Sequence, residues 1–191
     1  GDRQPLTAGG YPGIHTPFGA QSVRFAIAAL CSLAATGALA TGEDDIPFAQ
    51  LESIPPHVRS ALTGQTSLRE FSYSNRLNPF IVQGDFDGDG RPDAAILIRR
   101  KDNGKTGIAV FHSGSKTIHI LGAGRPVGNG GDDFSWMDAW YVYGKGLVER
   151  GAQPGSPPRL RGDALMVIKT ESASGLIYWS GTGYRWYQQG D

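Results

Sequence analysis

Short apolar runs, separated by glycine, proline and polar residues, make up most of the chain after residue 40. Runs of about four to eight residues bounded by turn formers are typical of β-strands rather than helices. One segment differs, because Pro55–Gly64 begins with prolines, ends at a glycine and places Val58, Ala61 and Leu62 at helical spacing. The pattern therefore predicts one short helix followed by a series of strands.

The predicted strands are joined by turns and loops that the sequence also marks. Two strands form a hairpin across Ser113–Ser115, and the last two form another across Gly181–Gly183. Arg125–Asp133 and Arg150–Arg161 have the glycines and prolines of loops. We expect a compact, mainly β, mostly antiparallel domain of about eight strands with one short helix. The expected strands span residues 79–83, 94–98, 106–112, 116–121, 138–143, 163–170, 174–180 and 184–188.

Composition narrows the class of protein. The 191 residues carry a formal net charge of +0, and 39% of them are hydrophobic. This permits one globular domain and gives no electrostatic reason to expect a nucleic-acid partner. The 28 glycines are about twice the usual share, in keeping with many turns.

The segment before residue 41 has a different character. Arg24 precedes the apolar stretch 25–35, and residues 38–40 read Ala-Leu-Ala. A basic start, an apolar centre and a small-residue end are typical of a secretory signal peptide. A buried alanine-rich helix is the alternative. Cleavage would divide the chain into 1–40 and a mature domain, 41–191, that has no membrane span and is periplasmic or secreted.

Residues 85–93 read Asp-Phe-Asp-Gly-Asp-Gly-Arg-Pro-Asp, with acids at loop positions 1, 3, 5 and 9. Ca²⁺ takes about six to eight oxygen ligands at roughly 2.3–2.6 Å, and this spacing offers several from one turn. Gly90 permits the sharp turn, and Arg91 would contribute its backbone carbonyl. An EF-hand would need Glu where Ile96 stands, and the flanking segments are strands. The rival interpretation is an ion-free turn, because Asp and Gly are also turn formers.

Gly84–Gly90, with Asp93 and the strand Ala94–Ile98, resembles the calcium loop of FG-GAP and VCBS-type repeats. Integrin-like β-propellers and many exported bacterial proteins carry that loop. The resemblance covers about residues 80–112. A propeller has about four to eight blades, and one such loop is present, so we do not expect a complete propeller. The resemblance implies a Ca²⁺ ion held by the side chains of Asp85, Asp87, Asp89 and Asp93 and the carbonyl of Arg91.

A second group of acids lies among aromatic residues. Asp132, Asp133 and Asp138 are close in sequence to Trp136 and Trp140. Glycosidases use two carboxyls about 5–5.5 Å or 6.5–9.5 Å apart, so a catalytic role is one hypothesis. Solvated loop acids are the alternative, and Asp132 or Asp133 could instead complete the calcium shell.

Other candidate chemistry is weaker. His112 and His119 fall on neighbouring predicted strands, but no third ligand for a metal is evident, and we expect them to be exposed. Gly122–Gly128 lacks the helix that a phosphate-binding loop requires. No serine-hydrolase, zinc-protease or Walker-type motif is present.

The last predicted hairpin is rich in aromatic residues. Strand alternation places Tyr184 and Trp186 on one face and Arg185 and Tyr187 on the other. One face would belong to the core, where cross-strand aromatic pairs stabilise a sheet. The other would be a platform for a glycan or a protein. The candidate binding surface consists of Trp136, Trp140, Arg185 and Tyr187.

These observations predict an exported, monomeric, calcium-binding β module that binds an unidentified protein or glycan and is not a catalyst. The alternative is a small secreted hydrolase acting on polysaccharide or phosphoester. A third hypothesis is a subunit or inhibitor of another exported protein.

Overall fold

The computed structural model describes residues 52, 54–64 and 68–190. All of them belong to the second of two units of the chain, Leu39–Asp191. The predicted signal segment 24–40 and its cleavage point after Ala40 lie outside the described residues. In the part of the chain that is described, no helix is long and apolar enough to cross a membrane.

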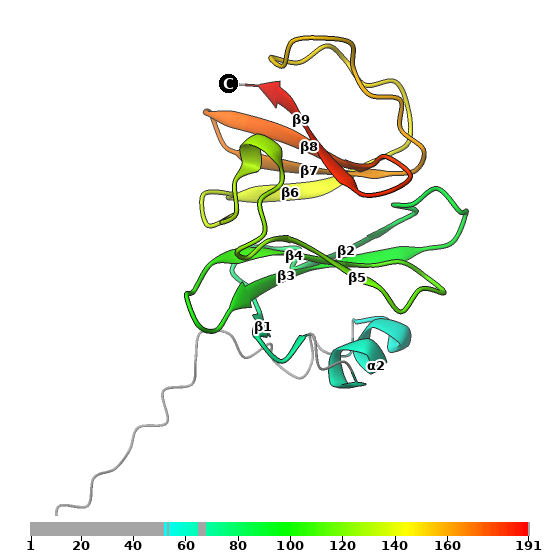
Figure 1. The fold of residues 1–191 in the computed structure, drawn as a ribbon, viewed down its shortest axis with the longest axis vertical. Coiled ribbons are helices and arrows are strands. Elements are labelled where there is room, and N and C mark those ends of the chain that lie inside the picture. Colours follow the sequence, from blue (N-terminus) through cyan, green and yellow to red (C-terminus); the bar gives the residue numbers. More distant parts are fainter. Residues whose placement is uncertain (1–51, 53, 65–67, 191) are drawn as a thin grey trace, which may run out of the picture. The chain divides into compact units, whose positions relative to one another are not determined.

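The described residues form nine antiparallel strands in two open sheets, with one short α-helix (Figure 1). The first sheet has the order β1-β3-β4-β5. Both β1 and β2 pair with β3, β2 along its first half and β1 along its last residues. The second sheet has the order β6-β7-β8-β9. Within these residues the sheets form neither a closed barrel nor a propeller. The elements are α2 (Pro56–Gly64), β1 (Phe71–Tyr73), β2 (Ile81–Gly84), β3 (Asp93–Arg100), β4 (Thr106–Phe111), β5 (Ile118–Gly122), the 3₁₀ turn η2 (Gly128–Gly130), β6 (Ala139–Tyr143), β7 (Ala164–Lys169), β8 (Ala173–Trp179) and β9 (Tyr184–Gly190).

The predicted fold class is confirmed, and each of the eight expected strands is present within a few residues of its expected bounds. The helix and both hairpins are also confirmed. One strand was missed, because β1 is only three residues long and too short to show a period. Phe71 anchors it in the core, with 5% of its surface exposed.

The first sheet is covered on both faces, which explains the continuous apolar run of β3. Ala95 and Leu97 face a core shared with the second sheet, whereas Ala94, Ile96 and Ile98 face a core that includes residues of α2. A strand with two covered faces is apolar throughout instead of alternating. Both hydrophobic layers therefore depend on β3.

The second sheet is also covered on both faces. Leu165 and Val167 of β7 face the first sheet, and Ala164 and Met166 face the opposite way. The irregular segment between β6 and β7 covers that outer face and packs Val148 against it. This cover buries Tyr187 of β9, which the sequence pattern places on the candidate binding surface.

Candidate metal site

The acidic loop 85–93 joins β2 to β3 and is closed by the pairing of Gly84 with Asp93. This confirms that the loop connects two strands. Gly88 and Gly90 have φ angles of 81° and 85°, a left-handed conformation that glycine adopts without steric cost. The two glycines turn the chain so that its carboxylates gather on the loop.

The first three acids of the loop bind their own backbone. The carboxylate of Asp85 accepts hydrogen bonds from the amides of Gly88 at 2.8 Å and Gly90 at 3.0 Å. Asp87 and Asp89 each accept one from the amide two residues later, at 3.1 and 2.9 Å. A carboxylate oxygen has a second lone pair, so these turns order the ligands and leave them able to bind a cation.

Asp85, Asp87 and Asp89 form one group that could hold a metal ion, with an oxygen from each within 4.8 Å of the others. One guanidinium reaches this group in the described part of the chain, since Arg91 Nε donates to Asp89 Oδ2 at 2.8 Å. That contact lowers the pKa of Asp89 and raises the pKa of Arg91. Three carboxylates share one guanidinium, which leaves an excess of negative charge for a cation to neutralise.

Asp87, Asp93 and His112 form a second such group. Asp93 is completely buried, and its oxygens accept hydrogen bonds from the amides of Phe86 at 2.9 Å and Ser113 at 2.7 Å. Burial raises the pKa of Asp93, against the opposing effects of the Ser113 hydrogen bond and the nearby His112. Asp93 thus fastens the loop to the segment after β4, whereas Asp85 and Asp89 belong only to the first group.

His112 connects the acidic loop to the second sheet. Its Nδ1 lies 3.4 Å from Asp87 Oδ2, and its Nε2 lies 2.7 Å from the hydroxyl of Tyr184. The prediction that this histidine is exposed is wrong, because only 6% of its surface is accessible. Its ring centroid lies 4.7 Å from that of His119 and 5.1 Å from that of Trp179. Burial lowers the pKa of His119 and raises that of Tyr184.

Asp163, the residue before β7, holds the loop from the other side. Its Oδ2 accepts a hydrogen bond from the amide of Asp85 at 2.9 Å, and its own amide donates to the Asp85 carbonyl at 2.6 Å. Its Oδ1 accepts from the amide of Lys145 at 2.8 Å. Nothing in the local sequence pattern relates Asp163 to an acid 78 positions earlier, so the sequence alone does not indicate its role.

The acids near the tryptophans have partners elsewhere in the fold. Asp133 accepts hydrogen bonds from the amides of Thr106 at 2.9 Å and Ser135 at 3.0 Å, and Asp132 pairs with Lys105. Burial of Asp133 works against its ionisation, but these hydrogen bonds outweigh burial and lower its pKa. Both acids lie at the opposite end of β4 from the acidic loop, about 17 Å away at the usual rise per residue. They do not complete the loop's ligand shell.

The side chain of Asp138 links the start of β6 to the end of β7 by hydrogen bonds. Its Oδ1 accepts hydrogen bonds from the amide and the hydroxyl of Thr170, both at 2.8 Å, and its Oδ2 accepts one from Lys169 at 3.1 Å. The Thr170 hydrogen bonds lower the pKa of Asp138 to about 2. These contacts give Asp138 a structural partner on the neighbouring strand.

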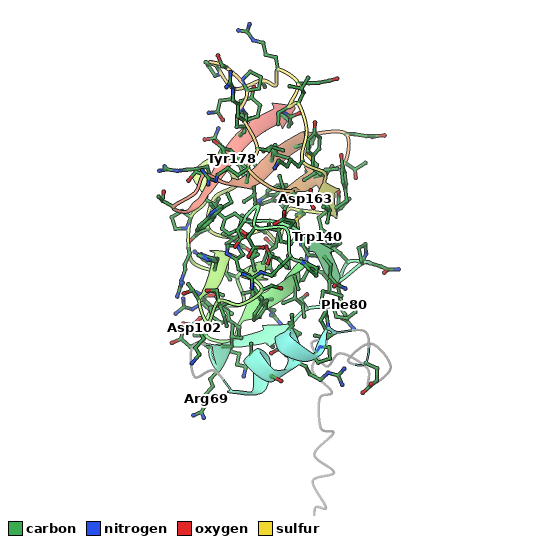
Figure 2. All side chains as sticks on the ribbon, turned by 90° about the vertical axis from the view of Figure 1, so that its right-hand side faces the viewer. Arg69, Phe80, Asp102, Trp140, Asp163 and Tyr178 are labelled. Atoms are coloured by element: carbon green, nitrogen blue, oxygen red, sulfur yellow. The ribbon has the colours of Figure 1, made fainter. Side chains whose placement is uncertain are left out.

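The predicted aromatic binding surface is wrong for two of its four residues. Trp140 is 4% exposed and donates its indole N–H to the Pro79 carbonyl at 2.6 Å, and Figure 2 shows it in the interior between the sheets. Tyr187 is 3% exposed and packs under the segment that covers the second sheet. Trp136 is half-buried, and Arg185 is exposed.

No protein-family model, curated protein or solved structure matches this chain. What the structure shows is a small β domain with acidic groups that could hold a metal ion. The likeness of the loop to FG-GAP and VCBS-type repeats therefore stays an expectation drawn from the loop residues.

Proposed function

We propose that this chain is a non-catalytic calcium-binding β domain in which the ion stabilises the loop between β2 and β3. The observation that carries the proposal is the convergence of Asp85, Asp87 and Asp89 within 4.8 Å on a loop turned by two glycines. A bound cation would neutralise the charge that Arg91 alone leaves uncompensated. Asp93 and the carbonyl of Arg91 would contribute further ligands, and water would complete a shell of about six to eight oxygens.

The donor set favours calcium. Carboxylate and carbonyl oxygens are hard ligands, and Ca²⁺ accepts a flexible shell of about six to eight of them, whereas Mg²⁺ demands near-octahedral geometry. The nitrogen of His112 beside Asp87 and Asp93 gives a specific reason to test a competing transition metal, because imidazole suits Zn²⁺. His112 Nε2 already binds Tyr184, so only Nδ1 faces the acids.

The ion's role in this proposal is structural. The backbone of Asp85 is bonded in both directions to Asp163, so a ligand of the ion is also a link between the two sheets. Fixing the Asp85 carboxylate would restrict the loop and strengthen that link.

The main experiment is calorimetric unfolding of the domain with and without Ca²⁺. At about ten times the dissociation constant, binding stabilises by about 1.4 kcal/mol, which for a chain of this size raises Tm by about 3–6 °C. Asp87→Ala combined with Asp89→Ala should abolish this rise. Arg91→Ala is the matched control and should keep the rise, because the ligand it supplies is a backbone carbonyl.

The same measurement tests the alternatives. Mg²⁺ should produce a smaller rise than Ca²⁺. An equal rise in the double variant would place the calcium effect elsewhere and refute the proposal. The domain could instead show no rise in Tm with Ca²⁺ and a rise with Zn²⁺ that is lost in His112→Gln. That result would place the metal site at the second group, Asp87, Asp93 and His112.

We also propose that the domain is exported and binds a protein or glycan as a monomer. The support for export is the signal-like composition of residues 24–40. Extracellular calcium modules bind with dissociation constants of about 10⁻⁴–10⁻³ M, which suits an exposed loop. N-terminal sequencing of exported protein should begin at Thr41, and a first residue well upstream would contradict cleavage after Ala40.

A further inference from the structure

The outer edge of β5 presents unpaired backbone groups. β5 ends the strand order of the first sheet, so β4 is its partner on one side only. At its end, Gly122 exchanges two hydrogen bonds of 2.9 Å with Arg125, so the Gly122 amide points away from β4. Backbone groups alternate in direction along a strand, so the N–H and C=O of Ile118 and Ile120 also point outward. Within the described residues, no backbone hydrogen bond meets them.

A groove follows this edge. It has a volume of about 400 Å³ and is lined by β5 residues, by the turn Arg125–Val127 and by Tyr184 of β9. A second hollow of about 540 Å³ adjoins it, since Pro126, Val127 and Tyr184 line both. The second hollow continues past Arg185 along β9, the edge strand of the other sheet.

The charged side chains that line the two hollows are both arginines. Arg125 lines the first hollow and Arg185 the second, and no aspartate or glutamate is among the lining residues. Both arginines are exposed, and neither forms an ion pair within the described part of the chain. Arginine binds carboxylates through paired hydrogen bonds, so an acidic ligand complements this lining.

We propose that the β5 edge and its groove bind an extended acidic peptide segment of a partner protein by strand addition. The peptide backbone pairs with Ile118 and Ile120, and its acidic side chains meet Arg125 and Arg185. In strand addition the main-chain hydrogen bonds supply affinity and the flanking side chains supply specificity. The inference makes the partner in the proposed function specific, and it does not depend on the calcium loop.

Two other occupants fit less well. A second copy of this chain, paired edge to edge along β5, would place two grooves lined by Arg125 against each other, and like charges oppose that pairing. A glycan would leave the regular backbone pattern of Ile118 and Ile120 unused. The edge geometry and the charge together favour a peptide.

The test is a titration of the ¹⁵N-labelled domain with an acetylated, amidated hexapeptide that alternates valine and glutamate. The amide signals of Ile118 and Ile120 should shift and become protected from hydrogen exchange. Arg125→Ala combined with Arg185→Ala should weaken binding at least about tenfold and reduce its salt dependence. Arg69→Ala, next to β1 at the opposite edge of the sheet, removes an arginine there and should leave the affinity unchanged. Retention of the other amide signals shows that each variant is folded.

N-methylated peptides separate strand addition from simple charge attraction. Methylating alternate amides removes the donors on one edge of the peptide, so one of the two methylated series should lose binding and the other should keep it. Equal binding by both series would overturn the proposal. Stronger binding of an oligogalacturonate than of the peptide would replace the peptide with a glycan, and dimerisation through β5 in light scattering would replace it with a second copy. A melting response to Ca²⁺ is unaffected by any of these results.

Discussion

At the residue scale, two glycines of the acidic loop share a backbone conformation but differ in their surroundings. A Cβ added to Gly88 would lie 2.4 Å from the carbonyl oxygen of Arg161, whereas one added to Gly90 would meet nothing within 4 Å. Gly162 completes the contact, since a Cβ there would lie 2.1 Å from the Asp85 carbonyl oxygen. The loop and the segment before β7 therefore touch backbone to backbone, with no room for a side chain.

This pair of glycines gives a matched comparison. Gly90→Ala should reduce the free energy of unfolding by about 1–2 kcal/mol, the cost of a left-handed residue that has a Cβ. Gly88→Ala carries that cost and a clash with Arg161, so it should lose at least about 1 kcal/mol more. Urea unfolding without calcium measures both. Equal losses would show that the loop does not rest on the segment before β7.

At the element scale, acidic side chains hold the ends of neighbouring strands together. Asp138 does so between β6 and β7, and Asp133 links the loop before β6 to the start of β4. In both cases the carboxylate accepts a hydrogen bond from a backbone amide at the end of a strand, that of Thr106 or that of Thr170. The acids that suggested a glycosidase in the sequence are thus explained by their contacts with strand ends.

Asp138→Asn should reveal this role through its pH dependence. The folded-state pKa of about 2 lies below the ordinary value of 3.8, because hydrogen bonds from Thr170 and Lys169 favour the ionised form. The resulting stability is present above pH 3.8 and is lost as the pH falls toward 2. Wild type should therefore exceed the variant in unfolding free energy at pH 7, with the difference shrinking through this window. A difference that stays constant from pH 7 to pH 2 would contradict an electrostatic role.

At the scale of the whole domain, the two sheets are joined by a mixed interface. One part of this interface is hydrophobic packing in the shared apolar core, where Phe86 and Phe134 are completely buried. The polar part lies at the edge of that core, where Asp163 binds Asp85 and where His112 bridges Asp87 and Tyr184. The acidic loop is a component of both polar links, so loop order and sheet packing are coupled.

Asp163→Ala should show that coupling. The variant leaves the amides of Asp85 and Lys145 without their acceptor, and we expect a loss of about 1–3 kcal/mol in unfolding free energy. Calcium affinity, measured by titration calorimetry, should fall as well, because the loop loses its support. Asp102→Ala is the control, since it breaks only an exposed pair with Arg100, and Figure 2 shows it far from Asp163. A normal calcium affinity in Asp163→Ala would refute the coupling.

The sequence by itself determined the features that depend on neighbouring residues. Alternate acids with glycines at the turning points define the loop between β2 and β3, because both requirements are met within nine positions of the chain. The helix, the hairpins and the apolar run Ala94–Ile98 of β3 follow equally from spacing, turn formers and strand length. The short β1 was missed because three residues contain no period.

The tertiary structure alone decided what depends on distant segments. It brought Asp163 to Asp85 across 78 positions, buried His112 between the sheets, and covered Tyr187 with the segment that follows β6. Strand alternation shows that two faces differ, but it does not show which other part of the chain will cover each of them. Burial and long-range hydrogen bonds are properties of the packed chain, and for that reason the partners of the acidic loop could be found only in the fold.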